Sequence, residues 1–543
     1  MSPLEAAARD WLALDPDPET RAEIEALLAD HDGKGLAERF GGRLEFGTAG
    51  LRGPLGAGPL RMNRVVVQQT TAGLARHLLA RGGAPTAVVG YDGRRNSRVF
   101  AEDAAAVLAG AGIAATLLPR ALPTPVLAFA VRDLAADAGV MITASHNPAP
   151  DNGYKLYLGG ADAGSQLVPP ADGEVLAQIE AVVADAAPLP RAGYAVADEG
   201  VLDRYVAATA AIPSASPAGD LPWVYTPMHG VGLETARRVL VAAGLPAPVV
   251  VPEQAEPDGS FPTAPFPNPE EPGTLDLATA LATASGAALV LANDPDADRL
   301  AVAVPRDDGW HRLTGNQVGL LLGWRIASTA GPVGGTLACS IVSTPGLARI
   351  AEHFGFLAVE TLTGFKWISR APGLLFGFEE ALGYLVDPDV VRDKDGISAL
   401  VAVLAAAIEL RRGGRTLLDL LGDVEAAIGR FDSDQVSVRV DDLAEIAAMT
   451  ARLRSAPPSS IGGLAVLAAD DLASGDGGLP ATDALRYSLE RGARVIVRPS
   501  GTEPKLKVYL DVHSDAATPE ARAAETAEAL DALRAGVGPL LGR

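Results

Sequence analysis

The sequence predicts an α/β fold that is divided among three or four domains. The chain has 543 residues, more than the roughly 250–300 over which one hydrophobic core usually extends. Hydrophobic residues make up 48% of it, enough to fill several cores. Short apolar runs typical of strands alternate with stretches of helical apolar spacing, and this alternation is typical of helices layered on sheets.

Charge and composition argue against several classes of partner. The net charge of -22 disfavours nucleic acid and anionic membranes, because both bind basic surfaces. No run of about 18 apolar residues predicts a membrane span, and residues 1–17 are too acidic and polar for a signal peptide, so we expect a cytoplasmic protein. The only cysteine, Cys339, lies in the apolar run 336–342. Disulfides and a cysteine-based zinc site are therefore excluded, and a buried core position is predicted.

Lysine is rare in this chain and is concentrated in candidate motifs. Only six of the 45 basic residues are lysines, so arginine is the default cation. A lysine that persists indicates a need for a compact, titratable ammonium that a guanidinium cannot imitate. Four of the six, Lys155, Lys366, Lys394 and Lys505, lie within the motifs and candidate sites described below, with chance clustering as the alternative.

The N-terminal part predicts a helical extension followed by a possible phosphate loop. Residues 1–40 show helical spacing of apolar residues, which predicts helices that pack on the rest of the chain. The glycine-rich segment 46–53 is suited to hold a phosphate through backbone amides and Arg52, although glycine-rich loops are common. The alternating pattern then begins with a strand, a helix and a strand at 86–91, 99–108 and 113–118.

A polar turn follows the apolar run 139–142. A buried strand that stops there presents Ser145 at the carboxyl edge of a sheet, where open α/β folds bind ligands. Ser145 is therefore the candidate reacting residue, and an ordinary loop of small and polar residues is the alternative. The segment 151–155 predicts a turn that brings Lys155 back toward the serine, where an ammonium can act as general acid or base. A solvated turn lysine is the alternative.

A second α/β unit begins after the linker-like segment 213–222, which is rich in proline, serine and alanine. Its first strand starts at Trp223 and ends at the polar segment 226–230. We place the first domain boundary in this linker.

Three aspartates follow the predicted strand 287–292. Acids at alternate positions of an extended segment point the same way, so Asp294, Asp296 and Asp298 are expected to converge as hard oxygen ligands. An EF-hand is excluded, since Arg299 occupies its glycine position. A structural acid turn is the alternative, but three uncompensated carboxylates repel one another. The sequence thus indicates a divalent cation site, and Mg²⁺ fits best because it shares its shell between carboxylates and phosphate.

The third and fourth units carry a candidate sugar site and a second phosphate site. Glu379 and Glu380 are adjacent, which does not suit a glycosidase pair, so recognition of a sugar hydroxyl by one acid is favoured. In the loop 498–505, one guanidinium, two hydroxyls and a glycine form a phosphate cradle, with an ordinary hairpin loop as the alternative. The expected helices are 315–328, 397–410 and 519–533, and the expected strands are 336–342, 357–362, 374–378, 494–497 and 506–512.

In order along the chain, five segments resemble the α-D-phosphohexomutase family of phosphoglucomutases and phosphomannomutases. They are FGTAGLRG, TASHNP, NDPDADR, GFEEALGY and RPSGTEPK, and the similarity spans residues 44–512. The resemblance implies three α/β domains with mixed sheets and a smaller C-terminal α+β domain around a central cleft. The expected domain limits are 1–215, 216–328, 329–430 and 431–543.

The resemblance also implies a role for each motif. Ser145 is expected to be phosphorylated and to bind Mg²⁺ together with Asp294, Asp296 and Asp298. His146 and Lys155 are the candidates for proton transfer. The further implied site residues are Arg52 in catalysis, Arg299 and Lys394 in support, Glu379 as the acid that contacts the sugar, and Thr363, Gly364, Lys366, Arg498, Ser500, Gly501, Thr502 and Lys505 in substrate binding.

The implied function is that of a phosphosugar mutase, with glucose 1-phosphate and glucose 6-phosphate as the expected pair. A sugar bisphosphate of the glucose 1,6-bisphosphate type is the expected intermediate and activator, and the enzyme is expected as a monomer or homodimer without nucleic acid or membrane partners. Because the bisphosphate has to turn over during the reaction, residues 431–543 are expected to close over bound substrate.

Ala381 departs from the commonest family pattern, which has serine two residues after Glu379. Together with the segments GYDGRRNS and TGFKWI, this alanine makes the chain look more like the phosphoglucomutase-2 and phosphopentomutase branch. Phosphopentomutase, phosphomannomutase and sugar 1,6-bisphosphate synthase activity therefore stay alternatives. A non-catalytic phosphosugar-binding protein is the alternative from a different class.

Overall fold

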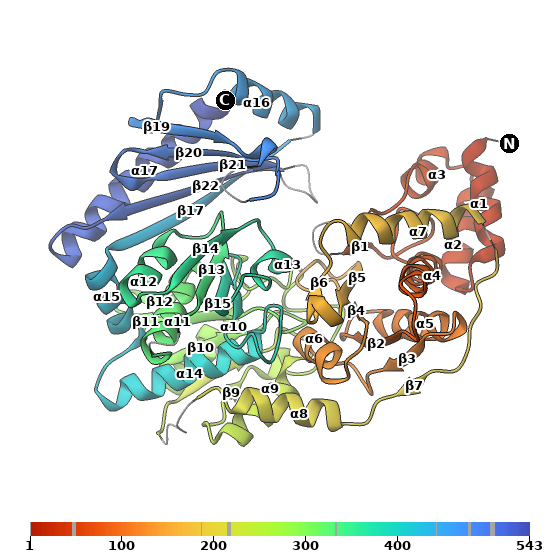
Figure 1. Ribbon diagram of the computed structural model, residues 1–543, viewed down its shortest axis with the longest axis horizontal. Helices are drawn as coiled ribbons and strands as arrows, with labels where there is room; N and C mark the ends of the chain where they lie inside the picture. The colour runs from red at the N-terminus through yellow and green to blue at the C-terminus, as the bar shows by residue number, and fades with distance from the viewer. Residues whose placement is uncertain are drawn as a thin grey trace. The chain divides into compact units, whose positions relative to one another are not determined.

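The computed structural model of the protein describes residues 2–45, 50–185, 187–213, 219–331, 334–440, 443–475, 479–499 and 505–542. By their contacts, the residues divide into two compact units, which are described separately. The first unit comprises Met1–Arg312 with Gly383–Glu409, and the second comprises Leu313–Leu382 with Leu410–Arg543. Figure 1 follows the chain by colour from its red N-terminus to its blue C-terminus.

Three short helices open the first unit, as the apolar spacing predicts. Ser2 and Glu5 form a capping box at the start of the first helix, and Ser2 accepts a hydrogen bond from the backbone of Glu5. Buried side chains of the three helices, such as Trp11, Ile24 and Leu36, belong to the same apolar core as the first sheet. The helices are α1 (Pro3–Leu14), α2 (Pro18–Ala29) and α3 (Gly33–Phe40).

The first sheet has seven strands in the order β1-β5-β4-β2-β3-β7, with β6 paired to β5. Strands β3, β2 and β4 run parallel, whereas β5 runs antiparallel to β4, so the sheet is mixed. The strands are β1 (Leu51–Pro54), β2 (Thr86–Tyr91), β3 (Ala114–Leu117), β4 (Ala138–Ile142), β5 (Asp151–Leu158), β6 (Ser165–Gln166) and β7 (Ala195–Val196).

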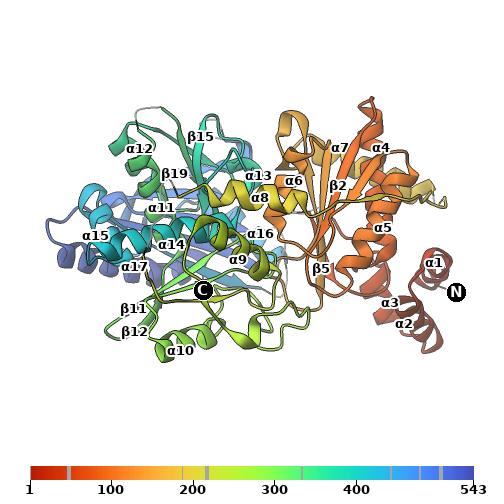
Figure 2. The same cartoon turned by 90° about the horizontal axis from the view of Figure 1, so that it is seen from below.

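Helices cover both faces of this sheet. In Figure 2, α4 and α5 lie on one side of the orange strands and α6 lies on the other. Helix α4 also packs against α7. The helices are α4 (Arg64–Ala80), α5 (Ser97–Gly110), α6 (Thr124–Asp133) and α7 (Ala171–Asp185).

The second sheet of the first unit has five strands in the order β12-β11-β10-β8-β9. Strand β10 runs parallel to β8 and antiparallel to β11, so this sheet is also mixed. The strands are β8 (Trp223–Thr226), β9 (Val249–Val250), β10 (Leu289–Ala292), β11 (Ala301–Arg306) and β12 (Gly309–Arg312). The helices that follow in chain order are α8 (Gly200–Ala210), α9 (Gly232–Ala243) and α10 (Asp276–Ser285), and the returning segment 383–409 contains β16 (Gly383–Leu385) and most of α14 (Gly396–Arg412).

The second unit contains a parallel sheet and an antiparallel sheet. The parallel strands have the order β14-β13-β15, and the six antiparallel strands have the order β17-β22-β21-β20-β19-β18. The strands are β13 (Thr336–Ser340), β14 (Leu357–Thr361), β15 (Leu374–Glu379), β17 (Arg430–Arg439), β18 (Ser460–Ile461), β19 (Leu464–Asp471), β20 (Leu485–Leu489), β21 (Arg494–Pro499) and β22 (Lys505–Ser514). The helices are α11 (Gly315–Thr329), α12 (Gly346–Phe354), α13 (Phe365–Ile368), α15 (Leu417–Ile428), α16 (Leu443–Ser455) and α17 (Pro519–Leu541).

A buried arginine joins the two sheets of the second unit. Arg494, at the start of β21, donates to Asp511 on β22 and to Glu360 on β14, with nitrogen to oxygen distances of 2.8 and 2.9 Å. It also donates to the backbone carbonyl of Ser343. Because the ion pair crosses from one sheet to the other, it fixes the sheets against each other within this unit.

Most predicted elements lie where the sequence indicates, but the segment after the serine loop differs. Residues 151–155 were expected to form a turn, but they begin strand β5, in which Lys155 is paired with Met141 of β4. The reason is that the chain has already reversed in the tight loop 143–150. Cys339 is free and buried, as predicted. Within the described parts of the chain, no helix has both the length and the apolar character that crossing a bilayer requires.

Candidate active site

Ser145 lies in the loop that follows β4, with its hydroxyl directed at an acidic group. The strand is fully buried, and the side chain of Ser145 is itself only 1% exposed. Its hydroxyl donates to Oδ2 of Asp294 at 2.7 Å, and Nδ1 of His146 lies 3.1 Å from the same hydroxyl oxygen. The backbone of Ser145 has a φ of 54°, a left-handed conformation that a residue with a side chain adopts at a cost. The loop is therefore held in a strained shape that faces the acids after β10.

The three predicted aspartates converge in the loop that follows β10. Asp294, Asp296 and Asp298 are all buried, and each offers an oxygen within 4.8 Å of those of the other two. The expected extended segment is wrong, because the chain turns here. The amide of Ala297 donates to the carbonyl of Asp294 at 2.8 Å, and Ala297 has a φ of 56°. This turn, and not alternation along a strand, brings the three carboxylates together.

Two lysines neutralise part of this acidic cluster. Lys155, 1% exposed on β5, donates to Oδ2 of Asp296 and to Oδ2 of Asp298, both at 2.7 Å. The ammonium of Lys394 lies 3.3 Å from Oδ2 of Asp298. Lys155, which was predicted to approach the serine, contacts two of the acids directly, and the third acid, Asp294, accepts from the serine hydroxyl.

The electrostatics of the cluster favour a further positive charge. Burial, together with Asp296 and Asp298, raises the pKa of Asp294 well above its usual value. The pKa of Asp298 moves the other way: burial would raise it, but Lys155 and Lys394 outweigh burial and lower it. Burial lowers the pKa of His146 well below its usual value, and the nearby Arg299 and Arg52 lower it further, so the imidazole is neutral near pH 7.

The oxygens of the cluster fit a hard divalent cation. Oδ1 of Asp296 and Oδ1 of Asp298 are buried, and neither finds a hydrogen-bond partner among the residues that the structure describes. Buried carboxylate oxygens without partners are costly unless a cation binds them. Carboxylate and hydroxyl oxygens are ligands that Mg²⁺ and similar cations prefer. The three aspartates with Ser145 Oγ could hold such an ion.

The remaining predicted residues of the first unit surround this cluster. Arg52 lies half-buried on β1, with Nη1 3.5 Å from Oδ1 of Asn147 in the serine loop. The backbone of Arg299 donates to Oδ1 of Asp294 at 3.0 Å, and its Nε lies 3.9 Å from Oδ1 of Asp298. Lys394 is held by the neighbouring Asp393, whose Oδ1 lies 3.7 Å from its ammonium. All the predicted residues of the first unit therefore gather at the ends of β4 and β10.

In the second unit, the sugar-recognition segment lies at the end of β15. Glu379 is the last residue of that strand. Glu380 is turned back onto the end of β13, where its carboxylate accepts from Ser340 and Ser343 at 3.2 and 3.0 Å. Thr363 and Gly364 lie between β14 and α13, and the ammonium of Lys366 lies 5.8 Å from the ring of Trp367.

The predicted distal phosphate loop is described only at its two ends. Arg498 lies near the end of β21, and Lys505 begins β22, which pairs with β21. Burial raises the pKa of Tyr509, and the nearby charge of Arg498 acts to lower it. Ser500, Gly501 and Thr502 lie outside the described residues.

Sequence reasoning missed several residues that build the site. Thr124, at the start of α6, donates from its hydroxyl to Oδ2 of Asp296 at 2.6 Å. The carboxylate of Asp393 accepts from Tyr157 and Gln166 at 2.8 and 2.6 Å, which fixes the residue beside Lys394. Arg94 donates to four carbonyls of the serine loop. These contacts join residues more than 50 positions apart, and only the segment GYDGRRNS around Arg94 stood out in the sequence.

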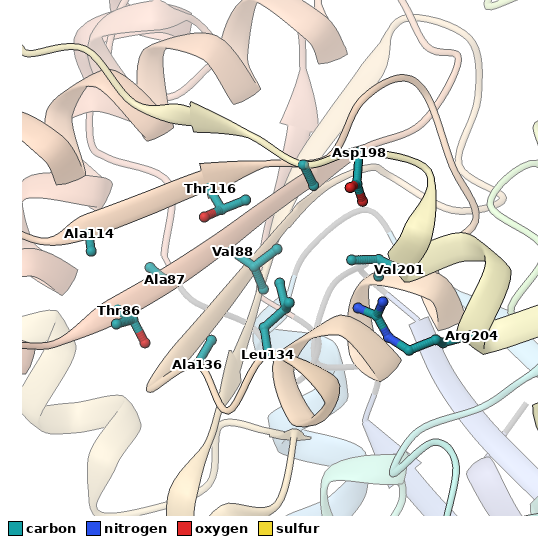
Figure 3. A pocket seen from close by; sticks show the side chains of 11 residues that line it. Thr86, Ala87, Val88, Ala114, Thr116, Leu134, Ala136, Asp198, Val201 and Arg204 are labelled. Atoms are coloured by element: carbon teal, nitrogen blue, oxygen red, sulfur yellow. The ribbon is translucent and has the colours of Figure 1, made fainter.

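A cavity of about 400 Å³ lies elsewhere in the first unit and is not part of this site. Its walls come from the starts of β2 and β3 and from the first turn of α8, as Figure 3 shows. The serine loop leaves β4 at the opposite, carboxyl end of the same parallel strands.

Between residues 43 and 529, the chain matches in order the four domains of one enzyme family. The matched domains are those of phosphoglucomutase/phosphomannomutase. They are alpha/beta/alpha domain I over residues 43–200, domain II over 203–309, domain III over 314–426, and the C-terminal domain over 436–529. The chain belongs to the phosphoglucomutase/phosphomannomutase family. Enzymes of this family are sugar phosphate mutases, so the chain is an isomerase of the phosphohexomutase type.

Relatives within the family carry different substrate names. The chain is 52% identical to the "Probable phosphomannomutase" of Haemophilus influenzae over 453 residues, which cover 83% of this chain and 93% of that protein. It is 35% identical to the "Phosphopentomutase" of Mus musculus, with 94% of this chain and 90% of that protein covered. A crystal structure from Thermus thermophilus, provisionally described as a phosphomannomutase, has a TM-score of 0.71 and 26% identity over 92% of this chain and all of that one. The relatives thus include proteins named for mannose phosphates and for pentose phosphates.

Proposed function

We propose that this phosphohexomutase interconverts a sugar 1-phosphate and a sugar 6-phosphate through a phosphoryl group on Ser145. The observation that carries the proposal is the contact between the Ser145 hydroxyl and Asp294 at 2.7 Å, at the edge of a buried three-carboxylate cluster. A serine in this position can share a cation with the acids while it gives or takes a phosphoryl group. A serine in an ordinary polar loop has no need of such neighbours.

The proposed chemistry moves one phosphoryl group in each half of the reaction. In the first half, a sugar hydroxyl oxygen forms a bond to the phosphorus, the bond from phosphorus to Ser145 Oγ breaks, and a base takes the hydroxyl proton while Oγ regains a proton. In the second half, Ser145 Oγ loses its proton and forms a bond to the phosphorus at the other end of the bisphosphate, the bond from that phosphorus to the sugar oxygen breaks, and the sugar oxygen takes up the proton. Mg²⁺ bound by the three aspartates and the serine would supply charge neutralisation for the transferred group.

The chain's own residues provide charge, proton acceptance and orientation. The neutral imidazole of His146 lies beside the serine oxygen and is suited to accept a proton. Lys155 holds Asp296 and Asp298 in place and adds a fixed positive charge next to the reacting group. Glu379 is proposed to bind a sugar hydroxyl, and Arg498 and Lys505 are proposed to bind the distal phosphate.

Intact mass and turnover test the phosphoserine directly. The purified enzyme, incubated with a sugar 1,6-bisphosphate, should gain the mass of one phosphoryl group, and Ser145→Ala should neither gain it nor turn over substrate. Ser285→Ala, which changes an exposed serine at the end of α10, is the matched control and should keep the modification. Full activity of Ser145→Ala would refute the proposal. Tight binding of a sugar phosphate without turnover by the unaltered chain would favour a non-catalytic binding protein instead.

We propose glucose as the sugar and a pentose as the second candidate. Similarity to a phosphopentomutase over 94% of the chain favours the second candidate, as does Ala381, which lacks the hydroxyl that many relatives offer after Glu379. The ratio of kcat/KM for glucose, mannose and ribose 1-phosphates, measured with Mg²⁺ and a bisphosphate activator, decides among the sugars. A ratio in favour of ribose 1-phosphate by tenfold or more would replace glucose as the proposed substrate.

A further inference from the structure

The guanidinium of Arg94 binds four backbone carbonyls in the Ser145 loop and at the start of β5. Its Nη2 donates to the carbonyls of Ser145 and Asn147 at 2.6 and 2.5 Å, and its Nη1 donates to those of Pro148 and Asp151 at 3.0 and 3.1 Å. Arg94 is only 4% exposed. One side chain thus contacts nearly every turn of the loop between β4 and β5.

The amide of the same serine is held by a neighbouring residue of its own loop. It donates to Oγ1 of Thr143 at 2.8 Å. On the other side, Asp92 orders the turn that carries Arg94, because it accepts from the amide of Arg94 at 3.0 Å and from Ser97 at 2.6 Å. Thr143 and Arg94 therefore fix the amide and the carbonyl of Ser145.

This double contact explains how Ser145 keeps its left-handed backbone. A φ of 54° is unfavourable for a residue with a side chain, and such a conformation persists only where the surroundings determine it. Hydrogen bonds from a charged donor inside a buried site are strong enough to do so. If the serine relaxed to an ordinary backbone conformation, its Oγ would leave its position 2.7 Å from Asp294.

The segment between β9 and α10, which connects strands of the second sheet, packs on Arg94. The ring of Phe261 lies over the guanidinium, with 4.8 Å between the guanidinium carbon and the ring centroid, and Phe261 is 1% exposed. A side chain at Gly259 would begin 3.1 Å from the Cα of Arg94, so this segment also packs closely on the turn. Because the acid loop belongs to that same second sheet, Arg94 contacts both parts of the structure that must meet at Ser145.

We propose that Arg94 is a positioning residue, which fixes the Ser145 oxygen against the acidic cluster without contacting the substrate. The inference rests on the proposed function, because it assumes that Ser145 is the group that is phosphorylated. It predicts that loss of the guanidinium slows transfer to Ser145 and loosens the loop, while sugar binding by other residues is preserved.

Arg94→Lys tests the proposal, because a lysine ammonium keeps the positive charge but lacks the planar set of N–H donors with which a guanidinium binds four carbonyls at once. We expect kcat to fall about 100-fold, the effect of roughly 1 Å of misplacement at a reacting group, with KM for the sugar phosphate changed less than about threefold. The rate at which a sugar bisphosphate phosphorylates Ser145, followed by intact mass, should fall in parallel. Arg95→Lys is the matched control, since the adjacent Arg95 side chain is 63% exposed, and it should match the unaltered enzyme.

Hydrogen exchange gives a readout that does not depend on activity. In the full-length Arg94→Lys protein, amides of residues 143–151 should exchange faster, while amides of the second unit should keep their protection. In Arg94→Ala, millimolar guanidinium chloride should restore part of the lost phosphorylation rate, because the ion can occupy the space left by the side chain.

These outcomes separate the inference from the proposed function. If Arg94→Lys keeps the rate of Ser145 phosphorylation and the protection of the loop, Arg94 does not position the serine. General loss of protection throughout both Arg94 variants, without rescue by guanidinium, would assign the side chain to overall stability and would also overturn the inference. Activity of Ser145→Ala would instead remove the phosphoserine, and the exchange of residues 143–151 would then still report whether Arg94 holds the loop.

Discussion

Lys155 is the residue on which the charge balance of the buried acids depends. Its ammonium lies 2.7 Å from an oxygen of Asp296 and 2.7 Å from an oxygen of Asp298. All three side chains are at most 1% exposed, so solvent screens their charges little. Removing one partner of a buried ion pair leaves the other charges uncompensated, and this costs more than the intact pair contributes.

Lys155→Met should therefore lower the free energy of unfolding by about 3–5 kcal/mol and abolish turnover. The midpoint of urea unfolding measures the first effect. Because a bound divalent cation would replace part of the lost positive charge, the loss of stability should shrink in excess Mg²⁺. Lys34→Met is the control, since its side chain is 89% exposed, and it should change the free energy by less than about 0.5 kcal/mol. A Lys155→Met protein as stable as the control would show that the acids are not charged in the fold.

At the scale of residues, the sequence predicts the site's chemistry better than its geometry. The serine, the three aspartates and Lys155 are recognisable because few residue types can perform their proposed roles. Thr124 and Tyr157 are not recognisable, since a threonine at a helix start and a tyrosine in a strand are ordinary in a core. Their contribution depends on folding partners 172 and 236 positions away, which no local pattern records.

Asp395 links the start of α14 to helix α8 within the first unit. Its Oδ1 accepts from the amides of Ile397 and Ser398, both at 3.0 Å, as a residue that caps a helix does. The hydroxyl of Tyr205 on α8 donates to the same carboxyl group at 3.0 Å. Burial raises the pKa of Asp395 to about 6, although these hydrogen bonds act to lower it.

The raised pKa makes the stability of this element depend on pH. The folded protein holds the proton of Asp395 more tightly than the unfolded chain does. The stability gained from this proton is therefore fully present below the pKa of Asp395 in the unfolded chain, about 3.9. It is lost as the pH rises through about 6. The difference between the folded and unfolded pKa of Asp395 corresponds to at most roughly 3 kcal/mol of unfolding free energy, which is lost between about pH 4 and 7.

Asp395→Asn should remove this dependence, because the amide has no proton to lose in that range. The urea midpoint of the unaltered protein should fall more between pH 5 and 7.5 than that of Asp395→Asn. Asp172, in the first turn of α7, provides the control substitution Asp172→Asn, which should leave the pH dependence unchanged. Parallel pH profiles for Asp395→Asn and the unaltered protein would contradict the assignment.

At the scale of elements, apolar periodicity predicts strands well and turns poorly. The expected strand 86–91 is β2 without change, and the run 139–142 differs from β4 by one residue. The turn expected at 151–155 is instead the start of β5, and the extended segment expected at 294–298 is a turn. Strands follow from buried apolar side chains, whereas turns made of Asn, Asp, Gly and Pro depend on which neighbouring backbone accepts their hydrogen bonds.

The whole molecule shows a division that the sequence does not display. The family's four domains are recognisable in order, and the domain limits proposed from the sequence stay a prediction. The contacts place the segment 383–409 with the first unit, although it follows strands of the second. Asp393 and Asp395 account in part for this grouping of the segment, since each accepts a hydrogen bond from a tyrosine of the first unit. Such long-range pairings leave no periodic signal.

This division locates every group of the candidate cation site in one unit. Ser145, the three aspartates, Lys155 and Lys394 all belong to the first unit. A cation that binds only the folded first unit stabilises that unit by RT ln(1 + [L]/Kd), which is about 2.7 kcal/mol at a concentration about 100 times Kd. Among the described residues of the second unit, no comparable acidic cluster is available to bind it.

Calorimetry with Mg²⁺ or with EDTA tests this consequence for the whole chain. The unfolding entropy is about 2 cal/mol/K per residue, which sums to roughly 0.7 kcal/mol/K for a unit of this size. Mg²⁺ should therefore raise the transition temperature of the first unit by about 4 °C. The transition of the second unit should stay where it is in EDTA. Asp296→Asn should abolish the Mg²⁺ effect, whereas Asp172→Asn should preserve it. An equal shift of both transitions would mean that the units unfold together or that the ion binds outside the aspartate cluster.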